Sequence, residues 1–239
     1  MALFSRRRGK DGPAPEPLQE EGTVSQEERE PEGASADDAT GPWDSRQAPQ
    51  DEVNRIDLGS LRIPVVDGMQ LRLEAPQPGA DIASVSLVLA GSQMSLRVFA
   101  APRSESLWDE VRQEITTTIT DNGGEVTVEE GPFGRELSTV VPVLDPSGKT
   151  VRSGLRLVGV DGPRWMLRAD FLGAAATSPE AATALEEILG GIIVHRDSLP
   201  RPPREPLPLH APGQAPGPEV EDLPGLDPLM PGPTIAEVR

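Results

Sequence analysis

Short runs of alternating apolar and polar residues fill the middle of this chain, and they constrain its fold more than any other feature. Gly, Pro or Asp residues separate the runs. Alternation with a period of two is typical of strands with one buried face, whereas a helix repeats its apolar positions at about 3.6 residues. The sequence therefore predicts strands over 56–65, 69–73, 85–89, 94–99, 125–130, 135–143, 151–160, 164–172 and 192–194.

Two segments have helical spacing instead. Ser104 or Ser106 can cap the first helix, and Gly123-Gly124 ends it; the second begins at Ser178-Pro179. The first helix has an apolar stripe that predicts burial against a sheet, formed by Trp108, Val111, Ile115 and Ile119. Strands, helix, strands, helix is the order of an α+β domain. We expect a single antiparallel sheet of about seven to nine strands flanked by two helices.

Proline and charge divide the chain into three parts. Of the 27 prolines, 6 lie in residues 1–52, 9 in 53–199 and 12 in 200–239. We predict a disordered acidic N-terminal tail (1–52), an α+β core domain (53–199) and a proline-rich C-terminal tail (200–239), because the tails have too little apolar surface to offset their ordering entropy. Leu207 and Leu209 could fasten the proline-rich strip to the core.

Composition excludes several kinds of chemistry. The absence of cysteine removes disulfides, thiolate nucleophiles and cysteine-bound zinc, and His195 and His210 are the two imidazoles. The sequence contains no phosphate loop, dinucleotide fingerprint or nucleophile elbow, so we expect no catalytic residues, metal or cofactor. The net charge of -17 argues against nucleic-acid binding. With no long apolar stretch, we expect a cytoplasmic protein with no membrane span.

Four arginines fall within predicted strands and form the hypothetical ligand-binding set: Arg97, Arg156, Arg164 and Arg168. The turn near Asp161-Gly162 decides which of them share a face. An odd-numbered loop puts Arg156, Arg164 and Arg168 together, whereas an even-numbered loop moves Arg156 to the other face. Clustered guanidinium groups need acidic partners. These could be Asp and Glu of the same domain, the acidic segment around residues 27–44, or an acidic partner.

Trp43 is a tryptophan in an otherwise polar acidic tail. Such a residue either anchors the tail onto its own domain or contacts another protein. We take Trp43 as a hypothetical partner anchor.

Several short motifs together resemble a known family. In order they are Gly41-Pro42-Trp43-Asp44, Asp57-Leu58-Gly59, Phe99-Ala100-Ala101-Pro102-Arg103, Trp108-Asp109-Glu110-Val111, Phe133-Gly134-Arg135-Glu136-Leu137 and Gly159-Val160-Asp161-Gly162-Pro163-Arg164-Trp165. The series is similar to the actinobacterial domain-of-unknown-function family 3710, over roughly residues 41–210. The order of elements also resembles PsbP-like domains. That second resemblance implies an assembly or adaptor module.

Two functions remain open from the sequence. The first is a non-catalytic interaction or adaptor module that binds a protein partner of unknown identity, in keeping with the low count of catalytic side chains. The alternative is an enzyme or binding protein that holds an anionic small ligand on the arginine-bearing face of the sheet. A deep pocket with a buried carboxylate near Arg164 or Arg168 would favour the alternative.

Overall fold

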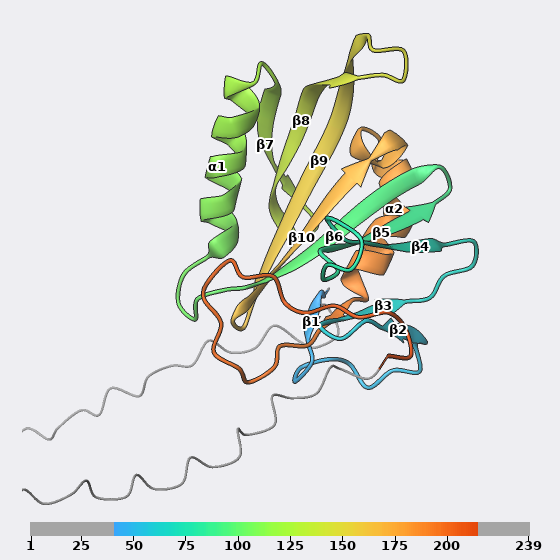
Figure 1. The fold of residues 1–239 in the computed structure, drawn as a ribbon, viewed down its shortest axis with the longest axis vertical. Helices are drawn as coiled ribbons and strands as arrows, with labels where there is room; N and C mark the ends of the chain where they lie inside the picture. Colours follow the sequence, from blue (N-terminus) through green and yellow to red (C-terminus); the bar gives the residue numbers. More distant parts are fainter. Residues whose placement is uncertain (1–40, 215–239) are drawn as a thin grey trace, which may run out of the picture. The chain divides into compact units, whose positions relative to one another are not determined.

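A computed structural model describes residues 41–214 of the chain (Figure 1). The predicted tails fall outside the described residues except for 41–52 and 200–214. The described part contains helices α1 (Leu107–Asp121) and α2 (Pro179–Gly190), the short 3₁₀ helix η1 (Gly173–Ala176) and eleven strands. The predicted class, α+β with a large antiparallel sheet and two helices, is confirmed.

Seven strands form the large sheet, and every neighbouring pair in it is antiparallel. The hairpins expected from turn signals join β5 to β6, β7 to β8 and β9 to β10. In spatial order the strands are β4 (Gln70–Glu74), β5 (Ser84–Leu89), β6 (Ser92–Ala100), β10 (Trp165–Leu172), β9 (Thr150–Gly162), β8 (Gly134–Leu144) and β7 (Glu125–Gly131).

The remaining strands form a second sheet, which corrects the expectation of a single one. Its order is β1 (Trp43–Asp44), β11 (Ile193–Val194), β3 (Leu61–Pro64) and β2 (Arg55–Asp57). The β1–β11 pair is parallel. A parallel pair requires a long connection, and here nearly the whole domain separates the two strands. Local alternation in the sequence cannot reveal such a pairing.

Each face of the large sheet has its own apolar core. One face packs against α2 and the small sheet, where Leu87, Leu96 and Phe171 meet Leu185 and Ile63. The other face packs against α1 along β7 to β10, and its buried residues include Trp108, Leu157 and Met166. Figure 1 shows α1 alongside β7 and β8, with α2 behind the β5–β6 side of the sheet. The predicted stripe of α1 belongs to this second core.

The helix ends follow the predicted signals. Ser106, one of the two candidates, caps α1 by accepting a hydrogen bond from the Asp109 amide, and Ser178 caps α2 through the Ala181 amide. Side-chain caps of this kind satisfy amides that the helix itself leaves free. The positions of both helices were therefore readable from short polar residues at their starts.

The proline-rich strip after residue 199 is fastened to the domain. Leu207 is only 2% exposed, and its amide donates to the Val98 carbonyl at 3.0 Å. Ala100 exchanges backbone hydrogen bonds with Glu205 and Arg204. The expectation that Leu207 and Leu209 hold this strip is confirmed, since both pack against the core. Residues 200–210 are called the strap below.

Close packing makes Gly159 a sensitive position. A Cβ added there would lie 2.1 Å from Cδ2 of Trp108. We predict that Gly159→Ala lowers the free energy of unfolding by about 1–3 kcal/mol, because the buried indole cannot move away without strain. Chemical denaturation measures the change. Gly190→Ala is the matched control, because its nearest neighbour would lie at 3.9 Å; an equal loss in both variants would contradict the packing explanation.

Candidate functional site

Arg156 does not join the other arginines. The β9–β10 turn has two residues, Pro163 and Arg164, between the paired Gly162 and Trp165. This even-numbered loop places Arg156 opposite Phe171, on the face that carries α2. The guanidinium pairs with both carboxylate oxygens of Glu136 at 2.8 Å and with Glu186 at 2.6 Å. Burial alone would lower the pKa of Arg156, but the hydrogen bonds that it donates to these two carboxylates outweigh the effect of burial and raise the pKa.

Arg164 lies in the turn and not in the strand where the sequence analysis put it. Its φ is +69°, in the left-handed region. Its carbonyl accepts hydrogen bonds from the Ala101 amide at 3.0 Å and from Nε of Arg196 at 2.9 Å. The backbone of Arg164 therefore links the turn to two other segments. The expectation that all four arginines form one cluster is therefore wrong for Arg156 and for Arg164.

Arg97 and Arg168 do come together. They are directly opposite each other on β6 and β10, and both bind Asp170. Arg168 holds Asp170 with Nε at 2.7 Å and Nη2 at 3.0 Å, while Arg97 uses only Nη1, at 2.7 Å. The Asp170 carboxylate is nearly buried, with 9% of its side chain exposed. One acidic residue of the same domain thus stands between two cations.

The surroundings of this pair form a polar half of the sheet that α1 leaves uncovered. Directly opposite residues share a face in an antiparallel sheet, so the registers place one polar row across β4, β5, β6 and β10: Arg72, Ser86, Ser95 and Asp170. We call these residues, with Arg97, Arg168 and Gln93, the polar face. The serines were not among the site residues expected from the sequence, although their alternation with apolar residues in 84–98 was the available signal.

Trp43 pairs with its own domain. Its amide donates to the Ile192 carbonyl at 2.9 Å, and the residue is half-buried in β1. The neighbouring Asp44 accepts a buried hydrogen bond from Nε1 of Trp165 at 2.9 Å. Residues 41–44 therefore anchor to the domain itself, while a contact of Trp43 with a partner stays a prediction.

Residues of other sequence motifs connect α1 to the large sheet through hydrogen bonds. Asp161 accepts from Oγ of Ser106 at 2.7 Å and from the Trp108 amide at 3.2 Å, so it holds the start of α1. Nε1 of Trp108 donates to the Arg135 carbonyl at 2.6 Å. The side chains of Asp161 and Trp108 are thus bonded within the fold, which is a structural use of these two positions.

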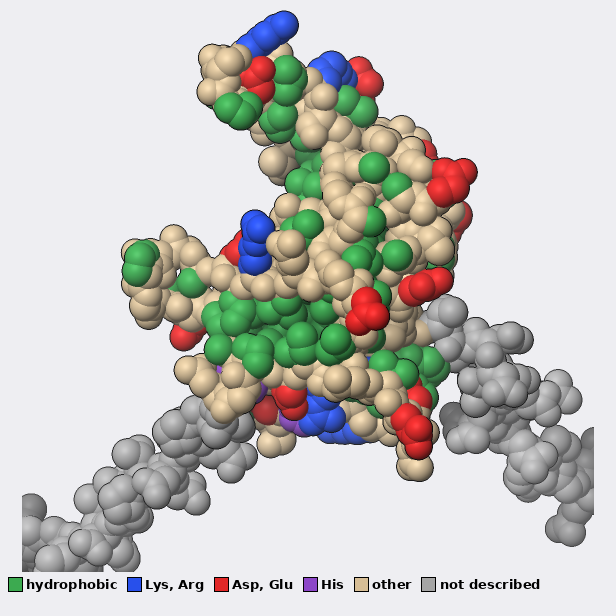
Figure 2. All heavy atoms as spheres, turned by 90° about the vertical axis from the view of Figure 1, so that its right-hand side faces the viewer, with side chains coloured by type: hydrophobic (Ala, Val, Ile, Leu, Met, Phe, Trp, Pro, Cys, Tyr) green, Lys and Arg blue, Asp and Glu red, His purple; other side chains and the backbone are tan. Residues whose placement is uncertain are grey.

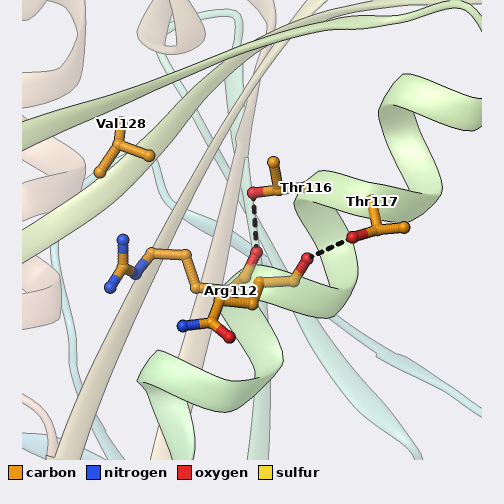
Figure 3. A pocket seen from close by; sticks show the side chains of 5 residues that line it. Arg112, Thr116, Thr117 and Val128 are labelled. Carbon is orange, nitrogen blue, oxygen red and sulfur yellow. Dashed lines mark hydrogen bonds between the residues drawn. The ribbon is translucent and has the colours of Figure 1, made fainter.

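A shallow groove lies between α1 and β7 (Figure 3). Its volume is about 290 Å³, and it is lined by Arg112, Gln113, Thr116, Thr117 and Val128. The hydroxyls of Thr116 and Thr117 donate to carbonyls of the preceding helical turn, at 2.8 and 3.1 Å. The two hydroxyl protons are therefore already used. Arg112 extends towards the strand of Val128 and binds Asp109 through Nη2.

The outer side of β4 is a free sheet edge. It ends the order of the large sheet, and none of the described strands pairs with it beyond β5. Apolar side chains gather beside it: Val65 and Val66 are 45% and 39% exposed, and Met69, Leu71 and Leu73 are half-buried. We call these five residues the edge patch. Figure 2, which faces the side of the molecule with β4, β3 and β2, shows a continuous hydrophobic area there.

Within residues 41–214, no group of three or more His, Asp or Glu side chains is arranged to hold a metal ion. Neither of its α-helices is long and apolar enough to cross a membrane.

Fold and surfaces together define an α+β domain with a polar half-sheet and a free apolar edge. A family model described as a protein of unknown function (DUF3710) matches residues 41–217, and the chain belongs to this family. Curated proteins show no match. The solution structure of cyanobacterial PsbP (CyanoP) from Synechocystis sp. PCC 6803 is similar, with 9% identity and a TM-score of 0.35 over 62% of this chain and 96% of that chain. We draw nothing further from this similarity.

Because Arg156 holds two carboxylates, we predict a structural role for it. Arg156→Met would leave Glu136, only 5% exposed, without its cation, and should lower the free energy of unfolding by about 3–5 kcal/mol. Chemical denaturation of both single variants and of the Glu136→Gln/Arg156→Met double variant measures the coupling. The double variant should recover part of the loss; purely additive effects would contradict a direct pair.

Asp109 reports on the position of Arg112. Its pKa lies below the ordinary value, chiefly because Arg112 donates a hydrogen bond to the carboxylate. We predict that Arg112→Gln raises this pKa, as followed by carbon NMR of the carboxyl group. A lowered folded-state pKa stabilises the fold above the unfolded-state pKa, and that contribution disappears as the pH falls through the folded-state value. Because Arg112→Gln lacks this contribution, the difference in stability between the variant and the natural chain should disappear as the pH falls.

Asp145 is the control for that titration. Its pKa is lowered first by the Ser147 hydroxyl and then by backbone amides, so Arg112→Gln should leave it unchanged. An unmoved Asp109 pKa would show that Arg112 points elsewhere in solution.

Proposed function

We propose that this protein is a non-catalytic interaction module that binds an extended segment of a partner protein along β4. The observation that carries the proposal is the edge patch beside a free strand edge. The bound segment would add a strand next to β4 and place alternate apolar side chains against the patch. The cytoplasm is the proposed setting, on the sequence grounds given above.

The free edge supplies the backbone part of such recognition. An edge strand presents unpaired amides and carbonyls, and many recognition domains bind extended peptides by pairing with them. Proteins commonly protect such edges with proline, bulges or covering segments. The β4 sequence, Gln-Leu-Arg-Leu-Glu, contains no proline.

The edge patch supplies the apolar part. Leu71 and Leu73 alternate along β4 and pack against the core, while Val65 and Val66 lie in the approach to the strand and are more exposed. Contiguous apolar surface on a soluble protein often marks an interaction site. Side chains at alternate positions of an added strand would cover this surface.

Charge indicates the character of the partner segment. Exposed acidic residues lie at β4: Glu74 is its last residue, and Asp67 and Asp81 lie in the connections before and after it. Figure 2 shows acidic side chains beside the hydrophobic area. Complementary charge favours encounter and suppresses wrong partners. We therefore propose a segment with alternating apolar residues flanked by Lys or Arg.

Catalysis has less support from the described residues. The motif side chains Asp161, Trp108 and Trp165 are hydrogen-bonded within the fold, and Arg156 is held between two carboxylates. A reacting group needs to be free to meet a substrate. These residues favour a structural scaffold that presents surfaces.

Peptide selection on the full-length chain tests this proposal. Short random peptides displayed on phage are selected, synthesised and titrated against the protein. We expect the selected peptides to alternate apolar residues, to carry basic flanks, and to protect β4 amides from hydrogen exchange. Val65→Glu/Val66→Glu should weaken their binding by at least about tenfold, because a carboxylate would have to be buried.

The control places the same change on another exposed apolar residue. Leu144, at the tip of the β8–β9 hairpin, is 73% exposed, so Leu144→Glu should leave peptide binding unchanged. If the peptides bind the edge-patch variant as tightly as the natural chain, or leave β4 amides unprotected, the proposal is wrong.

A further inference from the structure

The polar face is a surface separate from the edge patch. It lies on the opposite side of the large sheet from Leu71, Leu87 and Leu96, because its members alternate with those residues along β4, β5 and β6. Its floor consists of small side chains: Ser86 and Ser95 are 2% and 7% exposed. The long side chains of Arg97 and Gln93 rise beside them. A ligand held at Arg97 would therefore lie on the other side of the sheet from these apolar residues, two strands away from β4.

Asp170 fixes the orientation of Arg97 but does not occupy the Nε and Nη2 groups of its guanidinium. Arg97 binds Asp170 through Nη1 alone, and its Nε and Nη2 groups form no hydrogen bond with another described residue. That pair of N–H groups is the fork that binds a planar oxyanion in a bidentate manner. Arg168 uses the same fork on Asp170. The cluster thus already contains one bidentate pair of an arginine with a carboxylate, that of Arg168 with Asp170. The corresponding Nε and Nη2 groups of Arg97 remain accessible for a second carboxylate.

The exposure of Arg97 and the net charge of the cluster also favour binding of an anion. The Arg97 side chain is 36% exposed, so a ligand can reach it, while Arg168 is 23% exposed beside it. Two cations against one carboxylate leave the cluster one positive charge in excess. Oγ of Ser95 adds a buried polar atom that has no hydrogen-bond partner within residues 41–214, directly opposite Asp170 in the register. Buried polar atoms usually have a partner.

We infer that Arg97, with Arg168 behind it, forms a carboxylate-binding site. The Nε–Nη2 fork of Arg97 receives the two oxygens of the carboxylate, and Asp170 holds the guanidinium in position. A single negative charge balances the excess. The carboxylate can come from an acidic side chain of a peptide or from a free organic acid, since both present the same planar group.

The experiment uses the full-length chain with nitrogen-15 arginine. Sodium acetate and hexaglutamate are titrated separately at constant ionic strength, and the Nε–H resonances of the arginines are followed by NMR. We expect a saturable shift of the Arg97 resonance with carboxylate. Saturation by hexaglutamate at a much lower carboxylate concentration than acetate supports an acidic peptide as the source; equal saturation supports a small acid.

Three variants separate the fork from simple charge. Arg97→Gln should weaken binding by about tenfold or more, since hydrogen bonds between charged groups are the strong ones. Arg97→Lys keeps the charge but lacks the fork, and should also bind poorly. Arg72→Gln removes an exposed arginine on β4, two strands away from Arg97 and outside the proposed carboxylate site, and should bind within about twofold of the natural chain.

Folding does not obscure the result. In Arg97→Gln the Asp170 carboxylate keeps both bonds to Arg168, so thermal unfolding should change little. The inference is overturned if neither probe shifts the Arg97 resonance, if Arg97→Gln binds like the natural chain, or if Arg72→Gln loses as much affinity as Arg97→Gln. Those outcomes leave the proposal for β4 unaffected, because its variants, at Val65 and Val66, lie in the β3–β4 connection and not on the polar face.

Discussion

The hydrogen bond between Trp165 and Asp44 is the contact on which the arrangement of the two sheets depends. The indole is 1% exposed and lies at the start of β10, and the carboxylate belongs to β1 of the small sheet. A buried carboxylate is costly without a partner, so each residue requires the other. Gly162 makes room for the ring, because a Cβ there would lie 2.1 Å from it. Residues 41–44 are thereby bound to the large sheet as well as to β11.

Much of the fold was predictable because its signals are local. Alternation located the strands, and Ser106 and Ser178 located the helix starts. The second sheet was not predictable, because nearly the whole domain separates β1 from β11 in the sequence. Single residues, Trp43 and Leu207, were the available signals that the two terminal segments bind the domain, because composition alone gives neither the pairing of the first nor the burial of the second.

The four predicted arginines show where the sequence stops being informative about a site. All lie in or beside strands, yet a single residue in the length of the β9–β10 turn decides that Arg156 faces α2 while Arg168 faces away from it. Their acidic partners also come from distant segments, as Glu136, Glu186 and Asp170 show for Arg156 and Arg97. Residue type therefore predicted a charged surface, but only the register assigned each arginine a structural or an accessible position.

The strap has a consequence for where this domain can be shortened. The strap lies beside the last residues of β6, where the pairing with β5 has ended. Its backbone groups form hydrogen bonds with those of Val98 and Ala100. Cleavage after residue 199 would remove Leu207 from the interior and strip that stretch of its neighbour. Such a fragment would expose an unpaired strand edge that can pair with another chain. The smallest autonomous unit therefore extends at least to His210, whose amide donates to the Leu58 carbonyl.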